Sequence, residues 1–376
     1  MKKVFLLDID GVLVRQGGYR AALHATLNHF ANLMGLSHFD FPEEKLAELE
    51  RLEISSEWDM VPLLLGTFWN DILSHHPNLT LPADLFSAAV EIGRNVNGYA
   101  HKDLIIPDFE LIAGLYPSEA ALQNGCFPFI PLDLRTNLLS QSRNIRFSQT
   151  MRLFQHYSLG SRVFSETYDL PAEIETESFL LTHDRSNIDD GIRAKLHQPE
   201  IHLAALTARP SAPPREVNVS YFGYAPESEI ALELVGLTDM PLIGFGKLEY
   251  LAAEYGFSAG TLIKPSPVHA LAATAAALTG NEWAGLQSAG DWAQTGQLKG
   301  VFADLPRAFE LYVIEDTLGG IRSTQAAGEI LRKAGFDVTV HPLGLTSGSA
   351  AKTDAFTQAG VPHFENWEAL IAGTNL

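Results

Sequence analysis

Short apolar runs that end in polar residues recur along the chain. Residues 4–7 form a continuous apolar run that ends at Asp8, and a second run over 201–206 ends at Thr207. Consecutive apolar positions are typical of strands that are buried on both faces of a parallel sheet, and such sheets place their sites at the carboxyl ends of the strands. Further strands are predicted near 240–245, 311–314 and 338–340.

Between the first two runs the pattern changes to helical spacing. From about residue 15 to about residue 178, apolar residues recur at helical intervals with polar or proline breaks between segments. Strands that alternate with helices in the rest of the chain predict an α/β protein whose Rossmann-like parallel sheet is covered by helices on both faces. We expect a discontinuous core over 1–15 and 190–376, and a mostly α-helical cap domain over 16–189 that is inserted after the first strand.

Two local patterns add detail to this division. Residues 275–309 contain two tryptophans and several glycines, and we expect an irregular excursion there. Ser56 and Asp59 have the spacing of a capping box at the start of a helix, which we favour over a polar cluster that reaches a substrate.

Composition narrows the classes of partner. The 376 residues include 45 acidic and 26 basic ones, which gives a net charge of -19 and makes nucleic acid and anionic membranes unfavourable partners. Cys126 is the single cysteine, and the N-terminus leads directly into the first strand without a signal-peptide pattern. The sequence therefore predicts a cytoplasmic protein without a membrane span, and it gives no basis for an oligomeric state.

The most informative chemistry follows the first strand. A carboxylate can attack phosphorus when a cation reduces the repulsion between the two anions, and a second acid can protonate the leaving oxygen and later activate water. Asp8 and Asp10 have this spacing, and Gly11 permits a sharp turn with backbone N–H groups near phosphate oxygens. The same Asp-x-Asp-Gly pattern also occurs as an ordinary turn after a strand.

Three further strand-end segments carry polar residues of related chemistry. The Thr207 hydroxyl and the N–H of Ala208 suit a phosphoryl oxygen, and Lys264 suits the charge of the phosphoryl group and of Asp8. Adjacent acids, Glu315 and Asp316, suit a hard cation such as Mg2+. Each has a simpler explanation: a structural threonine, a surface lysine, and a helix N-cap at Asp316.

Taken together, these segments resemble the motifs of the haloacid dehalogenase-like hydrolase superfamily. The matching segments are Asp8-Ile9-Asp10-Gly11-Val12-Leu13, Thr207, Lys264-Pro265-Ser266-Pro267 and Ile314-Glu315-Asp316-Thr317-Leu318-Gly319-Gly320-Ile321. The lysine and Glu-Asp segments are similar to those of the phosphoglycolate phosphatase and β-phosphoglucomutase branch. The resemblance covers the predicted core, whereas the insert is larger than the helical cap usual in that branch.

The resemblance implies a role for each matched residue. Asp8 would form a phosphoaspartate, and Asp10 would be the general acid and base. Thr207 and Lys264 would hold the phosphoryl group. From their own chemistry and position, Gly11, Ala208 and Arg209 are candidate further substrate contacts; Arg209 alternatively forms a surface ion pair. The metal group would comprise Asp8, the backbone carbonyl of Asp10, Glu315 and Asp316.

The function expected from this resemblance is Mg2+-dependent phosphatase activity on a small phosphorylated metabolite. Dehalogenation is disfavoured, because dehalogenases of the superfamily lack the second aspartate, here Asp10. A phosphomutase with the same Asp8 intermediate remains open. A non-catalytic binding module is less favoured, because every motif acid and the lysine are present.

Overall fold

The chain divides into two compact units. The computed structural model describes residues 2–37, 42–54, 56–96, 104–220 and 222–374. One unit, called the core unit, comprises Met1–Gln16 and Asp184–Leu376, and the other, called the helical unit, comprises Gly17–His183. The helical unit therefore ends at His183 and not at residue 189. The returning chain already pairs with the core unit, since Arg185–Ser186 (β3) forms an antiparallel ladder with Val14–Arg15 (β2).

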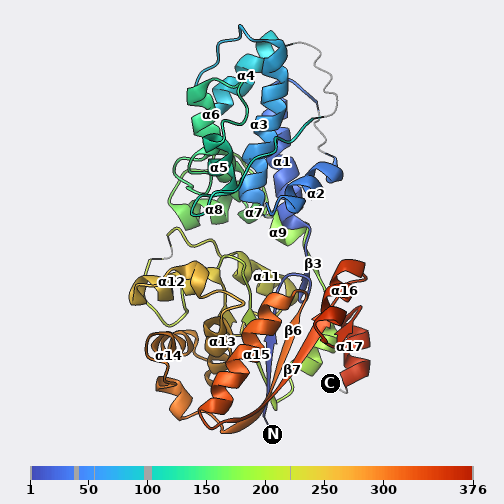
Figure 1. Cartoon of the computed structure of the whole chain (residues 1–376), viewed down its shortest axis with the longest axis vertical. Helices are drawn as coiled ribbons and strands as arrows, with labels where there is room; N and C mark the ends of the chain where they lie inside the picture. Colours follow the sequence, from blue (N-terminus) through green and yellow to red (C-terminus); the bar gives the residue numbers. More distant parts are fainter. Residues whose placement is uncertain (1, 38–41, 55, 97–103, 221, 375–376) are drawn as a thin grey trace. The chain divides into compact units, whose positions relative to one another are not determined.

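A six-stranded parallel sheet forms the centre of the core unit, in the order β5-β4-β1-β6-β7-β8. Figure 1 labels two of its strands, β6 and β7. In the central register, Leu7 lies beside Ala205 on one side and Ile314 on the other. The carboxyl ends of the three strands that precede Asp8, Thr207 and Asp316 therefore meet at one edge. The strands are β1 (Lys2–Leu7), β4 (Ile201–Leu206), β5 (Leu242–Ile243), β6 (Ala308–Glu315), β7 (Asp337–Leu345) and β8 (His363–Phe364).

Alternate residues of the strands pack against helices on opposite faces of this sheet. Val4 and Leu6 of β1 belong to a buried cluster with α12, α13, α14 and α15, whereas Phe5 and Leu7 belong to a cluster with α10, α11 and α17. This coverage of both faces explains the continuous apolar runs in the sequence. The helices are α10 (Asp190–Leu196), α11 (Glu227–Val235), α12 (Phe245–Tyr255), α13 (Pro267–Thr279), α14 (Glu282–Thr295), α15 (Leu318–Lys333), α16 (Ala350–Gln358) and α17 (Trp367–Thr374).

The expectation of an irregular excursion over 275–309 is wrong. Most of that stretch is helical, in the end of α13 and the whole of α14, and these two helices pack closely against each other. A Cβ atom at Gly285 of α14 would lie 2.7 Å from the carbonyl oxygen of Ala272 in α13. Glycine and alanine here therefore permit the close approach of two helices, and they do not mark a loop.

The helical unit is built around its own buried apolar cluster, to which α1, α3, α4 and α7 contribute. The capping box predicted at Ser56 and Asp59 is wrong, because Ser56 makes no side-chain cap hydrogen bond. Asp59 is fully buried and binds the guanidinium of Arg143 at 2.7 Å. The helices are α1 (Gly18–Leu33), α2 (Glu43–Arg51), α3 (Glu57–His75), α4 (Leu85–Asn95), α5 (Pro117–Gln123), α6 (Leu132–Leu139), α7 (Gln149–Leu159), α8 (Ser161–Tyr168) and α9 (Phe179–Thr182).

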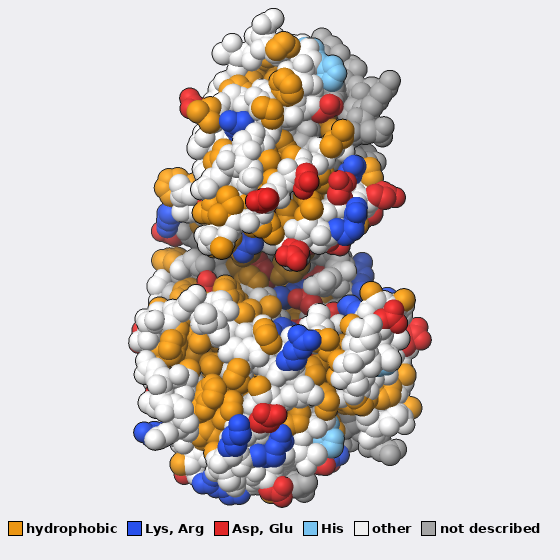
Figure 2. Space-filling model, viewed as in Figure 1, with side chains coloured by type: hydrophobic (Ala, Val, Ile, Leu, Met, Phe, Trp, Pro, Cys, Tyr) orange, Lys and Arg blue, Asp and Glu red, His pale blue; other side chains and the backbone are white. Residues whose placement is uncertain are grey.

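The surface shows charges of both signs. On the face in Figure 2, Lys and Arg side chains lie among Asp and Glu side chains on each unit, with apolar side chains between them. That face therefore presents no single-sign field that would select a polyanion or a polycation. None of the helices in the described part of the chain is long and apolar enough to span a membrane.

Candidate active site

The loop after β1 places Asp8 at the carboxyl end of this central strand. The Asp8 side chain is largely buried, and the N–H of Ile9 donates to its Oδ1 at 2.8 Å. Gly11 has a φ of +71°, and its N–H donates to the carbonyl oxygen of Val14 at 2.9 Å. A Cβ atom at Gly11 would overlap the carboxylate of Asp316. Glycine at this position thus permits the positive φ of the turn and leaves room for the carboxylate of Asp316.

Lys264 joins two of the acids. Its Nζ lies 2.7 Å from Oδ2 of Asp8 and 2.7 Å from Oε1 of Glu315. Burial by itself lowers the pKa of Lys264, but the charges of Asp8 and Glu315 outweigh burial and raise that pKa above its ordinary value. The ammonium group is therefore a fixed positive charge between two carboxyl groups, not the surface lysine that the sequence also allowed.

Buried His269 fixes the backbone at Lys264. The N–H of Lys264 donates to Nδ1 of His269 at 3.1 Å, and Nε2 of the same ring lies 2.8 Å from the carbonyl oxygen of Ile243. An acceptor at Nδ1 requires the neutral tautomer with hydrogen on Nε2. The imidazole therefore connects the lysine segment to β5.

Glu315 and Asp316 complete the acidic group. Burial, followed by the charge of Asp8, raises the pKa of Glu315 to about 8 and also raises the pKa of Asp316. Nζ of Lys352, at the start of α16, lies 2.5 Å from Oδ2 of Asp316. The ammonium groups of Lys264 and Lys352 thus contact three carboxyl groups, so acidic side chains are concentrated at this site.

The three acids fit a divalent metal ion. One carboxylate oxygen from each of Asp8, Glu315 and Asp316 lies within 4.8 Å of the other two. Hard oxygen ligands of this kind suit Mg2+. The backbone carbonyl of Asp10, which the resemblance adds to the metal ligands, belongs to the same loop as Asp8.

Thr207 lies at the carboxyl end of β4 and is fully buried. Its Oγ1 accepts a hydrogen bond from the N–H of Arg209 at 3.3 Å, and Ala208 between them is exposed. The carbonyl oxygen of Leu206, one residue earlier, lies 3.4 Å from Nζ of Lys264. The structure therefore brings the end of β4 beside the lysine, and Thr207 has a local structural role in ordering the turn.

Arg209 does not form the surface ion pair that the sequence also allowed. Its side chain is 2% exposed, and Nη2 lies 2.5 Å from Oδ1 of Asp10 and 3.1 Å from Oδ2 of Asp184. Nε of Arg209 also donates to Oδ1 of Asp10 at 2.7 Å. The guanidinium group is buried because it pairs with two carboxylates from different parts of the chain.

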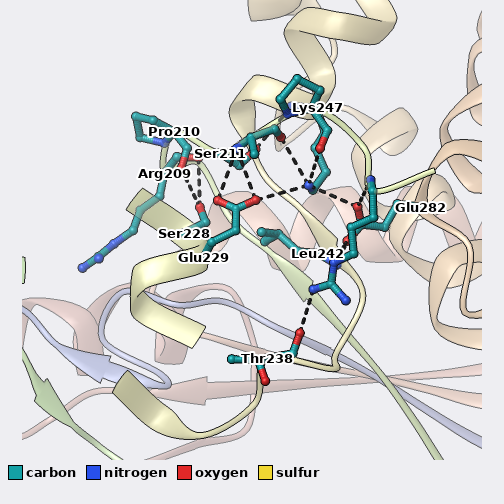
Figure 3. A network of polar contacts seen from close by, with 12 residues as sticks. Arg209, Pro210, Ser211, Ser228, Glu229, Thr238, Leu242, Lys247 and Glu282 are labelled. Atoms are coloured by element: carbon teal, nitrogen blue, oxygen red, sulfur yellow. Dashed lines mark hydrogen bonds and ion pairs between the residues drawn. The ribbon is translucent and has the colours of Figure 1, made fainter. Parts of the chain in front are cut away.

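A network of ion pairs around Lys247 holds the chain that follows Arg209 in place (Figure 3). Nζ of Lys247 lies 3.3 Å from Oε1 of Glu229 and 3.1 Å from Oε2 of Glu282. On the same segment, the hydroxyl of Ser228 donates to the carbonyl oxygen of Arg209 at 3.3 Å. The backbone of the loop is thus held by contacts other than those of the Arg209 side chain.

Sequence reasoning missed Asp184, His269 and Lys352. Asp184 lies 174 positions from Asp10, and only the tertiary structure shows that both bind one arginine. His269 lies five residues after Lys264, in the alanine-rich helix α13. A single histidine among alanines was the sequence feature that could have drawn attention to it. Lys352 follows β7, the strand beside β6, and the predicted meeting of parallel strand ends could have identified it.

Comparisons with protein-family models, with curated proteins and with solved structures found no match for this chain. The site consists of buried Asp8 and Glu315 and half-buried Asp316 at two adjacent strand ends, with Lys264 between Asp8 and Glu315 and Arg209 on Asp10.

Proposed function

We propose that this protein is a Mg2+-dependent phosphatase that hydrolyses a small phosphomonoester through a phosphoaspartate on Asp8. The observation that carries the proposal is the position of Lys264, with Nζ 2.7 Å from both Asp8 and Glu315, beside three carboxylates whose oxygens lie within 4.8 Å of one another. The ammonium group of Lys264, together with a cation held by the three carboxylates, would allow an anionic nucleophile to meet an anionic substrate.

Asp8, Glu315 and Asp316 would hold the Mg2+ ion, which when bound would neutralise phosphoryl charge. Lys264 adds a permanent positive charge beside Asp8 and Glu315 and orients the carboxylate of Asp8. The largely buried position of Asp8 excludes most water from the nucleophile.

The reaction then has two halves in which atoms and charges balance. A carboxylate oxygen of Asp8 bonds to phosphorus, the bond from phosphorus to the leaving oxygen breaks, and Asp10 in its acid form gives that oxygen a proton. Asp10 as carboxylate next takes a proton from water, whose oxygen bonds to phosphorus. The bond from phosphorus to Asp8 breaks, which restores the carboxylate and releases phosphate.

The helical unit is proposed to act as a cap that restricts the substrate to small metabolites. Its support is the chain connectivity: the helical unit is inserted directly after the loop that carries Asp8 and Asp10. A cap of this kind would exclude bulk water during phosphoryl transfer and would select substrates by size.

The test is phosphate release from a panel of sugar phosphates, phosphoglycolate and 4-nitrophenyl phosphate, with Mg2+ and with a chelator. Wild type should require Mg2+, and Asp8→Asn should have no turnover. A matched control is Asp304→Asn, the same substitution at an exposed aspartate that follows a short 3-10 turn, which should keep full activity.

Two outcomes would contradict the proposal. Phosphate release that persists in Asp8→Asn would exclude the phosphoaspartate route. No release from any substrate by wild type would remove the support for a phosphatase, and conversion between sugar phosphate isomers would then be measured, since a mutase would use the same residues.

A further inference from the structure

Asp184 is buried and ionically paired, yet it lies outside every motif of the proposed mechanism. It is 1% exposed, and its Oδ2 lies 3.1 Å from Nη2 of Arg209. The other carboxylate on that guanidinium belongs to Asp10, whose side chain is 22% exposed. One buried cation therefore connects a buried carboxylate to the more accessible carboxylate that is proposed to transfer protons.

We propose that Asp184 is a positioning residue for the reaction: it holds the guanidinium of Arg209, which in turn fixes the position from which the carboxyl group of Asp10 reaches the leaving oxygen and to which it returns. This inference rests on the proposed function and adds a residue to it. Asp184 is proposed to act through Arg209, and no role at a reacting atom is assigned to it.

The geometry gives Arg209 two kinds of contact. Toward Asp10 it presents two nitrogens: Nε lies 2.7 Å and 2.9 Å from the two carboxylate oxygens, and Nη2 lies 2.5 Å from Oδ1. Such a fork fixes the plane of the carboxyl group as well as its position. Toward Asp184 it presents Nη2, at 3.1 Å from Oδ2. Asp10 is thus oriented by the fork, and Asp184 anchors the arginine.

The anchor matters because a buried guanidinium requires a carboxylate partner at every stage. When Asp10 turns to the leaving oxygen or to water, its contact with Arg209 weakens. Asp184 remains paired with Arg209 and keeps the guanidinium in place, since a buried charge left without its partner is strongly destabilising. Asp10 can then return to the same position for the second half of the reaction.

The location of Asp184 in the chain supports this role. Asp10 precedes the helical unit in sequence, and Asp184 is the first residue of the core unit after it. The two segments are also joined by backbone, as the N–H of Asn187 donates to the carbonyl oxygen of Leu13 at 2.8 Å. Arg209 adds a side-chain connection between the same two segments and extends it to the proposed acid.

The test uses the full-length protein with Mg2+ and two substrates that differ in leaving group, phenyl phosphate and 4-nitrophenyl phosphate. Nitrophenolate leaves without much help from an acid, whereas phenolate needs a proton. Asp184→Asn should therefore lower kcat for phenyl phosphate about tenfold more than it lowers kcat for 4-nitrophenyl phosphate. The expected difference is smaller than the 10²–10⁴-fold contribution of a positioned general acid, because Asp10 itself is still present. Asp184→Glu, which retains the carboxylate, should recover part of the difference.

The matched control is Glu282→Gln. It also replaces a buried carboxylate by its amide, since Glu282 is 1% exposed and pairs with Lys247. It loosens the neighbouring network without changing the contacts of the Arg209 side chain, so it should slow both substrates by the same factor. KM should change little in Asp184→Asn, because the variant alters no group that is proposed to bind the phosphoryl group.

Each result separates the inference from the proposed function. If wild type hydrolyses neither substrate, the proposed function fails and this inference fails with it. If wild type is active and Asp184→Asn slows both substrates equally, or neither, only this inference is overturned. If Asp184→Asn does not fold, as judged by thermal unfolding, Arg209→Lys replaces it: the buried charge stays but the fork is lost, and an equal effect on both substrates would again refute the role.

Discussion

His269 should make the core unit sensitive to acid. The ring is fully buried, with Lys264 N–H on Nδ1 and Nε2–H on the carbonyl oxygen of Ile243. Burial, and to a lesser extent the charge of Lys264, lowers the pKa of this imidazole to about 3. Protonation would place a second donor against the Lys264 N–H and a charge in the apolar interior.

The magnitude follows from proton linkage. A histidine in the unfolded chain titrates near pH 6.5, so below that pH the unfolded state binds more protons than the folded state. Stability is therefore lost as the pH falls from about 6.5 toward 3, by at most about 1.4 kcal/mol per pH unit. Between about pH 8 and about pH 5, His269 alone should lower the free energy of unfolding by about 2 kcal/mol.

His269→Gln isolates this contribution, because glutamine does not titrate. At about pH 8 the variant should be less stable than wild type by about 1–3 kcal/mol, since the amide cannot reproduce both hydrogen bonds. At about pH 5 that gap should shrink by about 2 kcal/mol, because only wild type loses stability through the imidazole.

The assay is urea unfolding of both proteins at the two pH values. The two units can unfold separately, so the signal must come from the core unit alone. A background with Trp58→Phe and Trp69→Phe removes the tryptophans of the helical unit and leaves those of the core unit. A stability gap that is the same at both pH values would refute the reasoning about His269.

Three further predictions concern other positions. In Gly11→Ala, the new Cβ would overlap the carboxylate of Asp316, and the backbone φ of +71° would be strained. Binding of Mn2+, used as a probe of the proposed Mg2+ site and measured by calorimetry, should weaken by about tenfold or more. Unchanged affinity would contradict the packing argument. Lys352→Met removes an ammonium group 2.5 Å from Asp316, so Mn2+ affinity should rise by about fivefold in low salt and by less in high salt, and a fall in affinity would show that the lysine supports the site. Asp59→Asn weakens the buried pair with Arg143 and should destabilise the helical unit by about 2–3 kcal/mol in thermal unfolding; an unchanged transition would show that the pair contributes nothing.

The sequence could predict which residues of the site follow the carboxyl ends of strands. Asp8, Thr207 and Asp316 each follow an apolar run, and parallel strands bring their carboxyl ends to one edge of a sheet. The structure has this arrangement, with Leu7 beside both Ala205 and Ile314. Their roles in phosphoryl transfer stay predictions, because chemistry requires a measurement of activity.

The alanine- and glycine-rich stretch shows where the local pattern misled. Glycines in 275–309 suggested a loop, yet Gly285 lies inside α14, where its missing side chain admits the backbone of α13. Whether a glycine breaks a helix or permits close packing depends on what lies opposite, and that information comes from residues distant in sequence.

The sequence by itself determined the parallel α/β class, the helical insert after the first strand, and the presence of acids and a threonine at strand ends. These follow from local periodicity and from the fixed geometry of parallel sheets. The strand end expected before Lys264 was wrong, because Lys264 follows a 3-10 turn at Ala259–Thr261. Only the tertiary structure decided that Lys264 lies between Asp8 and Glu315, that His269 holds its backbone, and that Asp10 shares Arg209 with Asp184. Ion pairs between distant residues have no sequence period, because they depend on where the folded backbone brings two side chains within hydrogen-bonding distance.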